Sequence, residues 1–485
     1  MHFHRNHVAR KTSRDFTSGK VLKNLILFSI PMAIATLLQV LFNAADVAIV
    51  GQFAGSKYQA AVGGTSSTVH LLVNLFIGIS VGANVAMANA FGAKDEARQH
   101  RVVHSAMALS FVSGIFVLAL GIVASRWILQ AIDVPSDVLD LSVLYLRVYF
   151  LGAPAMMIYN FGASIMRAVG ETKKPLYYLF VAGVLNVVIN IVTVVFFDMH
   201  VVGVALGTVI SQYVSAVWVL IDLMRAKGAE KYSFKKTRFY KREVKHILLI
   251  GVPTGVSSCM FSLSNVLMQA EVNKFGSITL AGRSIGSNVD MFCDAFASSV
   301  EKGVVTFVGQ NVGAKKPERI NRIVGAGMFA SMCFQAFYGT VMLLFGKYVC
   351  MLYNRDPAVI EEALKWVAYI SATQILMSFM YIFGATLRGM GYSIFPMLIN
   401  LFFTCVARLI YIWTIYPLFA VQTIEKIYII YPITWILSGG VQMTAYYCVR
   451  AWERRKAKKR AEAVETAATQ SELEQPELEK EIAAS

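Results

Sequence analysis

The sequence predicts an all-α, polytopic membrane protein in which twelve transmembrane helices form two pseudo-symmetric bundles of six. Three observations predict this class: 56% of the 485 residues are hydrophobic and only 15% are charged, apolar stretches recur along nearly the whole chain, and the chain resembles itself at an offset of 221–222 residues. A soluble protein carries about 25% charged residues. The composition therefore excludes a soluble enzyme, a disordered protein and a secreted disulfide scaffold.

Each apolar stretch is predicted to be a helix, because lipid offers the backbone no hydrogen-bond partner except itself. About 20 residues are needed to cross the hydrocarbon core. Several stretches are longer, so we expect tilted helices or helices that extend beyond the bilayer. The predicted spans are residues 23–50, 59–87, 102–125, 138–165, 175–197, 202–224, 245–273, 278–308, 321–345, 360–386, 393–416 and 427–449.

The distribution of positive charge orients these helices. With the N-terminus in the cytoplasm, 33 of the 45 Lys and Arg residues fall on cytoplasmic segments, counting Lys23 at the edge of the first span, and only 6 in outside loops. Cytoplasmic loops carry this excess in membrane proteins, so both termini are predicted to be cytoplasmic. Because the basic residues lie in short loops and not on one soluble face, we expect no nucleic-acid partner.

The longest internal loop is basic and divides the chain into two halves of six spans. After about residue 461 the C-terminal tail becomes rich in Ala and Glu, and we predict that this part is disordered, while its basic start lies against anionic headgroups. The predicted domains are an N-terminal tail (1–22), an N-lobe (23–224), a cytoplasmic linker (225–244), a C-lobe (245–450) and a cytoplasmic tail (451–485).

The internal repeat indicates a transporter. Pro31 corresponds to Pro253, and Gly170 corresponds to Gly391, at a nearly constant offset along six spans. Since six is an even number, both halves enter the membrane from the same side and are related by an axis along the membrane normal. Two lobes of this kind enclose a cavity, and rocking the lobes exposes the cavity to either face in turn.

Polar residues in the first half form a candidate cation site. A charge at the bilayer centre costs roughly 3 kcal/mol, so an acidic residue inside a span is a functional candidate. Carboxylate, amide and hydroxyl oxygens suit a small cation, whereas apolar surroundings favour a protonated carboxyl, so either Na⁺ or H⁺ could bind. The simpler alternative is that the amides only bridge helices. The candidates are Asn43 and Asp46 in the first span, Asn186 and Asn190 in the fifth, and Thr208 in the sixth. Gln39 shares the face of Asn43 and Asp46, and we expect it to line the substrate cavity or relay charge.

A charged stripe marks the eighth span. Arg283, Asp290, Asp294 and Glu301 follow one another at steps of 7, 4 and 7 residues, which keeps them on one helix face. We expect Arg408 in the eleventh span to be their counter-charge. The stripe is either an internal ion-pair seam or a cavity wall that meets a cationic or zwitterionic substrate or relays protons.

Over roughly residues 20–450 the chain resembles the multidrug and toxin extrusion (MATE) family of antiporters, in the bacterial branch with an acidic residue in helix 1. The likeness rests on the six-helix repeat, the helix-1 pattern around Pro31 and NAADVAIVGQ, and SIMRAVGETKKP after helix 4. The resemblance implies two bundles in a V around a central cavity. It also implies an N-lobe cation site made by Asp46, Asn186, Asn190 and Thr208.

Two departures from the family pattern concern the charges. Asn190 stands where many members have Asp, which removes one negative charge from the implied cation site. NorM-type members carry acids midway along helices 7 and 10, whereas the corresponding stretches near Phe261 and Met377 carry none. Glu271 lies closer to the outer end of helix 7 and does not match these acids.

The residues and the resemblance together predict a secondary active antiporter that exports organic drugs or toxins, cationic ones above all, while H⁺ or Na⁺ moves inward. No Walker motif, HExxH or nucleophile elbow occurs, so we expect no enzyme activity, no cofactor besides the coupling ion and no metal apart from transient Na⁺ at Asp46. We expect a monomer in the bacterial inner membrane, in contact with small organic substrates and lipid. The alternatives are a lipid-linked oligosaccharide flippase, which favours a basic cavity, and a receptor-like or structural membrane protein.

Overall fold

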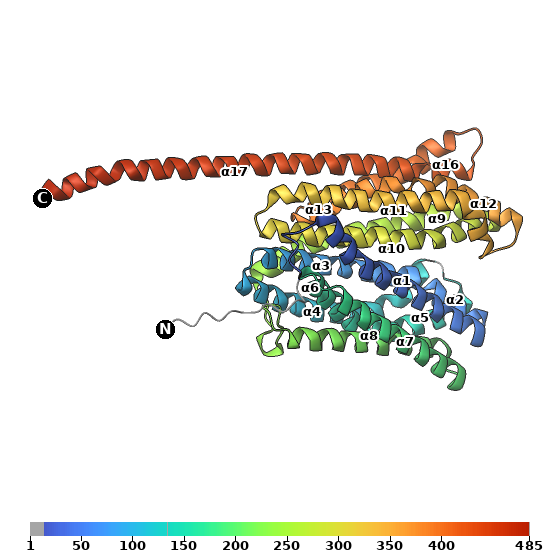
Figure 1. Cartoon of the computed structure of the whole chain (residues 1–485). Helices are drawn as coiled ribbons and strands as arrows, with labels where there is room; N and C mark the ends of the chain where they lie inside the picture. The colour runs from blue at the N-terminus through green and yellow to red at the C-terminus, as the bar shows by residue number, and fades with distance from the viewer. Residues whose placement is uncertain (1–13, 133, 485) are drawn as a thin grey trace.

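The computed structural model describes residues 14–132 and 134–484, and these residues form helices and connecting loops (Figure 1). Most of the predicted N-terminal tail, residues 1–13, lies outside the described part. The helices of the first half are α1 (Val21–Phe53), α2 (Ser56–Gly64), α3 (Ser66–Gly92), α4 (Glu96–Ala131), α5 (Ser136–Phe150), α6 (Ala153–Ala168), α7 (Lys173–Ile191) with its π-helical continuation η1 (Val192–Phe196), and α8 (His200–Arg225).

The second half follows a short turn, η2 (Phe234–Lys236), in the basic loop. Its helices repeat the order of the first half, but the eleventh predicted span is divided into short α-helical and π-helical pieces. They are α9 (Lys241–Asn273), α10 (Ser277–Gly313), α11 (Pro317–Met351), α12 (Pro357–Tyr369), η3 (Ser371–Leu376), α13 (Met377–Gly389), α14 (Ile394–Asn400), η4 (Leu401–Val406), α15 (Ala407–Ile410), η5 (Tyr411–Ile415), η6 (Tyr416–Leu418), α16 (Ile424–Tyr428) and α17 (Ile430–Ala484).

These helices fall into the twelve predicted spans. Within the described residues, nine helices are long and apolar enough to cross a membrane, or ten if α5 and α6, which are bent by 49° to each other, count as one span. The other two spans are α10, whose charged stripe lowers its hydropathy, and the start of α17. Figure 1 shows the helices of the first half, blue to green, lying beside those of the second half, yellow to red.

Small residues join the two halves where α3 crosses α9. Gly78 and Gly82 on α3 face Gly251 and Gly255 on α9, a spacing of four residues on each helix that is typical of close helix packing in membranes. A Cβ atom on Gly78 would lie 2.2 Å from the Cα atom of Gly255. The backbones of the two halves therefore touch directly at this crossing.

Polar contacts add to this junction. Thr306 on α10 donates a hydrogen bond to Asn84 Oδ1 on α3 at 3.1 Å. Gln310 on α10 donates from Nε2 to the carbonyl oxygen of Ala168, at the end of α6, at 2.8 Å. Both hydrogen bonds are buried, so they join the two halves without solvent between the donor and the acceptor.

The segment before α1 covers the same end of the junction. Phe16 is 2% exposed and stacks on Phe307 with ring centroids 3.9 Å apart. Its backbone N–H donates to Gln310 Oε1 at 2.9 Å, and its carbonyl oxygen accepts from Asn311 Nδ2 at 3.2 Å. The two halves are thus closed against each other at the end where the described chain begins.

Both ends of the described chain lie on one side. The N–H of Arg14 donates to Val169 O at 3.2 Å, in the loop after α6. Arg450 on α17 donates to Pro317 O at 2.8 Å, at the start of α11. This agrees with an even number of spans.

The C-terminal tail differs from the prediction. Disorder was predicted after about residue 461, but helix α17 continues to Ala484 and extends well beyond the bundle (Figure 1). Ala and Glu have high helix propensity, and an ion pair at i, i+4 between Lys458 and Glu462, with Nζ and Oε1 3.7 Å apart, supports the extension. The prediction of disorder rested on the low hydrophobicity of the tail, whereas the high helix propensity of Ala and Glu favours a continuous helix.

We expect Gly78→Ala to destabilise the protein, because the new methyl group would overlap the backbone of α9. Overpacking of this kind costs about 1–3 kcal/mol. The matched control is Gly440→Ala in α17, where a Cβ atom would meet nothing within 4 Å. Thermal unfolding of both purified variants tests this, and equal melting temperatures would show that α3 and α9 do not touch as described.

Candidate functional site

Three helices of the first half bring polar side chains to one buried point. Asp46 on α1 is 6% exposed. Asn190 on α7 donates from Nδ2 to Asp46 Oδ1 at 2.6 Å, and Thr208 on α8 donates from Oγ1 to Asp46 Oδ2 at 3.3 Å. Each carboxylate oxygen therefore accepts a hydrogen bond from a different helix, which is how a buried charge is tolerated inside a membrane protein.

A fourth residue completes this cluster, which we call the Asp46 cluster (Asp46, Asn186, Asn190 and Thr208). Asn186 Nδ2 donates to Thr208 Oγ1 at 3.2 Å, and Asn186 Oδ1 accepts from Asn190 Nδ2 at 3.4 Å. Asn190 Oδ1 is buried and has no hydrogen-bond partner in the described part of the chain. The cluster thus contains a carboxylate and a free amide oxygen side by side, both hard ligands for a small cation.

The backbone around the cluster is locally unusual. Helix α7 changes into the π-helical segment η1 two residues after Asn190, and π-helical turns occur often at functional sites. On α8, Gly207 makes room for the amide, because a Cβ atom there would lie 2.0 Å from Asn190 Oδ1. Helices α7 and α8 can therefore approach each other closely at the level of Asp46.

Asn43, which was predicted to belong to this site, lies apart from it, as does Gln39 on the same helix face. Asn43 and Gln39 are exposed, and neither hydrogen-bonds to the Asp46 cluster in the described part of the structure. Gln39 is seven residues before Asp46, about 10 Å along the helix axis, so its side chain is out of reach. Asn43 lies at the edge of the buried face of α1. Of these three residues, Asp46 is the one that hydrogen-bonds to α7 and α8 in the described part of the chain.

The charged stripe of α10 is divided among separate environments. Asp290 is 4% exposed and accepts hydrogen bonds from Tyr338 at 2.6 Å, Trp366 Nε1 at 2.7 Å and Ser371 at 2.7 Å. Arg283 is buried as well and bonds to Gln269 Oε1. Its guanidinium also lies over the Trp366 ring, with Cζ 5.5 Å from the ring centroid. Asp290 and Arg283 thus tie α10 to α9, α11 and α12.

The other two members of the stripe differ from this pair. Glu301 forms an ion pair with Arg388 on α13. Asp294 is exposed, and within the described residues it has no ion pair or side-chain hydrogen bond. Its helix face also carries exposed Ser287, Met291 and Lys302. Asp294 is therefore the member of the stripe that is open to a ligand.

The prediction that Arg408 balances the acids of the stripe is wrong. Arg408 on α15 is fully buried and donates from Nε to Thr434 Oγ1 at 3.1 Å. Its guanidinium lies over the ring of Tyr431, with Cζ 4.3 Å from the centroid. Both partners are on α17, because this face of the eleventh span packs against the twelfth span and not against α10.

Sequence reasoning missed the neutral partners of the acids. Tyr338, Trp366 and Ser371 surround Asp290, yet an aromatic or hydroxyl side chain in an apolar span carries no signal of its own.

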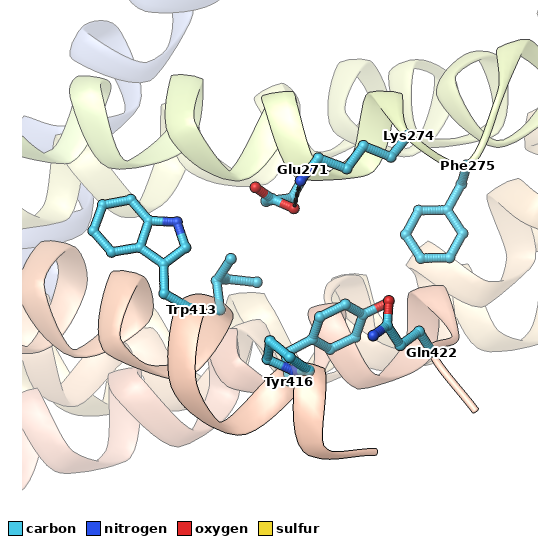
Figure 2. Close-up of a pocket in the computed structure, with 8 residues that line it drawn as sticks. Glu271, Lys274, Phe275, Trp413, Tyr416 and Gln422 are labelled. Atoms are coloured by element: carbon cyan, nitrogen blue, oxygen red, sulfur yellow. Dashed lines mark hydrogen bonds and ion pairs between the residues drawn. The ribbon is translucent and has the colours of Figure 1, made fainter. Parts of the chain in front are cut away.

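A pocket opens in the second half, at the end far from the described chain ends. It has a volume of about 410 Å³ and is lined by Glu271, Lys274, Phe275, Ile412, Trp413, Tyr416, Pro417 and Gln422 (Figure 2). Figure 2 shows Glu271 and Lys274 on one wall and Trp413 and Tyr416 on the other. The two charges pair with each other at 2.7 Å, so Glu271 does not stand free as a coupling acid. Among the described residues no group of three or more His, Cys, Asp or Glu could hold a metal ion.

Comparison with known proteins agrees with this architecture. The family model described as MatE matches residues 31–192 and again residues 253–414, one match in each half. The relative named "Probable multidrug resistance protein YoeA" of Bacillus subtilis is 24% identical over 389 residues, covering 79% of this chain and 84% of that protein. The multidrug export protein MepA of Staphylococcus aureus is 24% identical over 376 residues, covering 78% and 83%.

Solved structures show the same fold. One described as the outward-facing conformation of a multidrug resistance MATE family transporter has a TM-score of 0.83 at 19% identity and covers 92% of this chain and 100% of that one. Another, of MATE in the straight conformation, has a TM-score of 0.84 at 19% identity with the same coverage. These matches confirm the predicted resemblance and fold class.

We expect Asp290→Ala to lower the thermal stability of the protein, because three donors, two of them buried, would lose their acceptor. Each orphaned donor costs about 1–3 kcal/mol. Asp294→Ala is the matched control, since Asp294 is exposed and lacks a described partner. Thermal unfolding should show a clear loss for the first variant and little change for the second. Equal stability of both variants would mean that Asp290 has no structural role.

Proposed function

The chain belongs to the MatE family, and on that premise we propose that it is a secondary active antiporter that exports organic compounds, cationic ones above all, while H⁺ or Na⁺ moves inward. The observation that carries the proposal is the buried Asp46 carboxylate, held by Asn190 and Thr208 from two other helices. The multidrug names of the relatives support an organic substrate. The proposed place is the bacterial inner membrane, with both termini in the cytoplasm and the protein acting as a monomer.

The Asp46 cluster suits either coupling ion. A sodium ion would find the two carboxylate oxygens, the free Asn190 Oδ1 and the hydroxyl oxygen of Thr208 around one point. A proton would convert one carboxylate oxygen into a donor, for which Asn190 Oδ1 is the free acceptor nearby. In both cases the cation neutralises a buried charge, so the bound and empty states differ in electrostatic energy.

Helix α1 connects this site to the junction between the halves. Helix α1 packs on α7 and α8 and also on α10 and α11. Asp46 makes its hydrogen bonds with α7 and α8, whereas Ser29, earlier in α1, faces α10. Ser29 of α1 contacts α10, where its hydroxyl donates a hydrogen bond to Ser299 O at 3.4 Å. Pro31, between Ser29 and Asp46, removes one backbone hydrogen bond and weakens the helix there. Cation binding at Asp46 can therefore shift one part of α1 against the other.

The exposed face of α10 is the proposed substrate contact. Asp294 offers a free negative charge there, with Ser287 and Met291 on the same face. Gln39 and Asn43 on α1 are exposed too, and we place them on the opposite wall of the cavity between the lobes. An acid beside a flexible, polarisable Met fits varied organic cations. A flippase for lipid-linked oligosaccharides would need a basic wall, so the free acid does not favour that alternative.

We expect Asp46→Asn to abolish ion-driven efflux, because an amide cannot exchange a cation. The assay is efflux from proteoliposomes under an imposed pH gradient and then, separately, under a Na⁺ gradient. The gradient that drives the wild type identifies the ion. Asp137→Asn, an acid-to-amide change at the exposed start of α5, is the matched control and should transport normally. Efflux by Asp46→Asn at the rate of the control would refute the coupling site.

We expect Asp294→Asn to weaken transport of cationic substrates about tenfold, equal to 1.4 kcal/mol for one lost charge contact, and to leave neutral substrates unaffected. The same proteoliposomes give KM and maximal rate for a cationic and a neutral compound of similar size. A KM for the cation that matches the wild type would mean that Asp294 does not contact the substrate.

A further inference from the structure

The second half contains a buried cation without an anion. Arg408 is 0% exposed, and its guanidinium is charged at all physiological pH values. Within the described residues no Asp or Glu forms an ion pair with it, and its Nη1 and Nη2 atoms have no hydrogen-bond partner. An unpaired charge inside a membrane protein is costly, so the site needs compensation from outside the polypeptide.

The groups around Arg408 offer only partial compensation. The Tyr431 ring below the guanidinium gives a cation–π contact, and Thr434 accepts from Nε. Trp435 is 3% exposed, and its indole Nε1, which can only donate, has no partner in the described part of the chain. Within the described residues the indole N–H is thus a spare donor beside the guanidinium, and no carboxylate balances the charge.

The internal repeat relates the location of Arg408 to that of the Asp46 cluster. The two family-model matches, 31–192 and 253–414, are offset by 222 residues, which places Arg408 at the position of Asn186. At the same offset Met268 replaces Asp46, and Ile412 replaces Asn190. Met268 and Ile412 are buried in one apolar cluster with Tyr431 and Trp435. The second half thus keeps the location of the Asp46 cluster but exchanges its negative charge for a positive one.

The backbone is also specialised at this point. The π-helical segments η4 and η5 flank α15, just as η1 follows Asn190 in the first half. Ile412, one helical turn beyond Arg408, lines the pocket of Figure 2, with Lys274 at its wall. Arg408 is therefore one helical turn away from a residue that lines a pocket.

We propose that the second half binds a small anion, a halide or the carboxylate of a small molecule, between the Nη atoms of Arg408 and the indole N–H of Trp435. The anion would neutralise the buried guanidinium and accept the unpartnered hydrogen bonds. This site is separate from the Asp46 cluster and does not rest on the proposed antiport.

The test is thermal unfolding of the purified full-length protein in sodium gluconate, with chloride, bromide or acetate replacing gluconate at constant Na⁺ and ionic strength. We expect the melting temperature to rise and saturate with the bound anion, by roughly 3 °C or more at a hundredfold excess over Kd. A rise with chloride and bromide identifies a halide site, and a rise with acetate alone identifies a carboxylate site. A melting temperature that is the same in all four salts overturns the proposal.

Variants assign the effect to the site. Arg408→Gln should remove the anion dependence, and the matched control Arg126→Gln, at an exposed arginine paired with Asp140, should keep it. If Arg408→Gln does not fold, Trp435→Phe removes one donor at similar size and should shift the midpoint to higher anion concentration. Asp46→Asn should keep the full anion dependence even if transport is lost. An anion effect that persists unchanged in Arg408→Gln, or in Trp435→Phe where only that variant folds, contradicts the proposal.

Discussion

The hydrogen bond from Asn190 to Asp46, 2.6 Å long, is the interaction on which the account of this protein depends. A carboxylate inside a membrane protein must be satisfied by donors or neutralised by a cation. Here donors from α7 and α8 hold the carboxylate of α1, and α1 continues to the junction with the second half. Any change of charge at Asp46 therefore acts on a helix that packs against both halves.

The two halves share a backbone plan and differ in chemistry. Both have a proline in the first helix of the repeat and π-helical turns in the fifth, but Asp46 has no acidic counterpart, since Met268 takes its place. The second half instead carries the buried Arg408. It also carries the buried acid Asp290, which accepts hydrogen bonds from neighbouring helices. The internal repeat thus contains two equivalent locations of opposite charge, with Asp46 in the first half and Arg408 in the second.

Much of this could be predicted from the sequence. Apolar length predicts the spans, and the spacing of Asp46, Asn186, Asn190 and Thr208 predicted residues that the structure brings together. Periodicity predicts which face a side chain occupies but not which helix lies against that face. For this reason Arg408 was paired with the wrong helix, and Asn43 was grouped with a cluster that it does not join. The partners of Asp290 are neutral, so charge patterning could not reveal them.

The most direct test of the central claim is the release of the coupling cation when substrate binds. In the purified wild-type protein, titration with a cationic substrate should release H⁺ or Na⁺, measured with a pH indicator or a Na⁺ electrode. The Asp46→Asn variant should bind substrate without releasing either ion. Substrate binding to the wild type with no cation release, or equal release from the variant, would contradict the account.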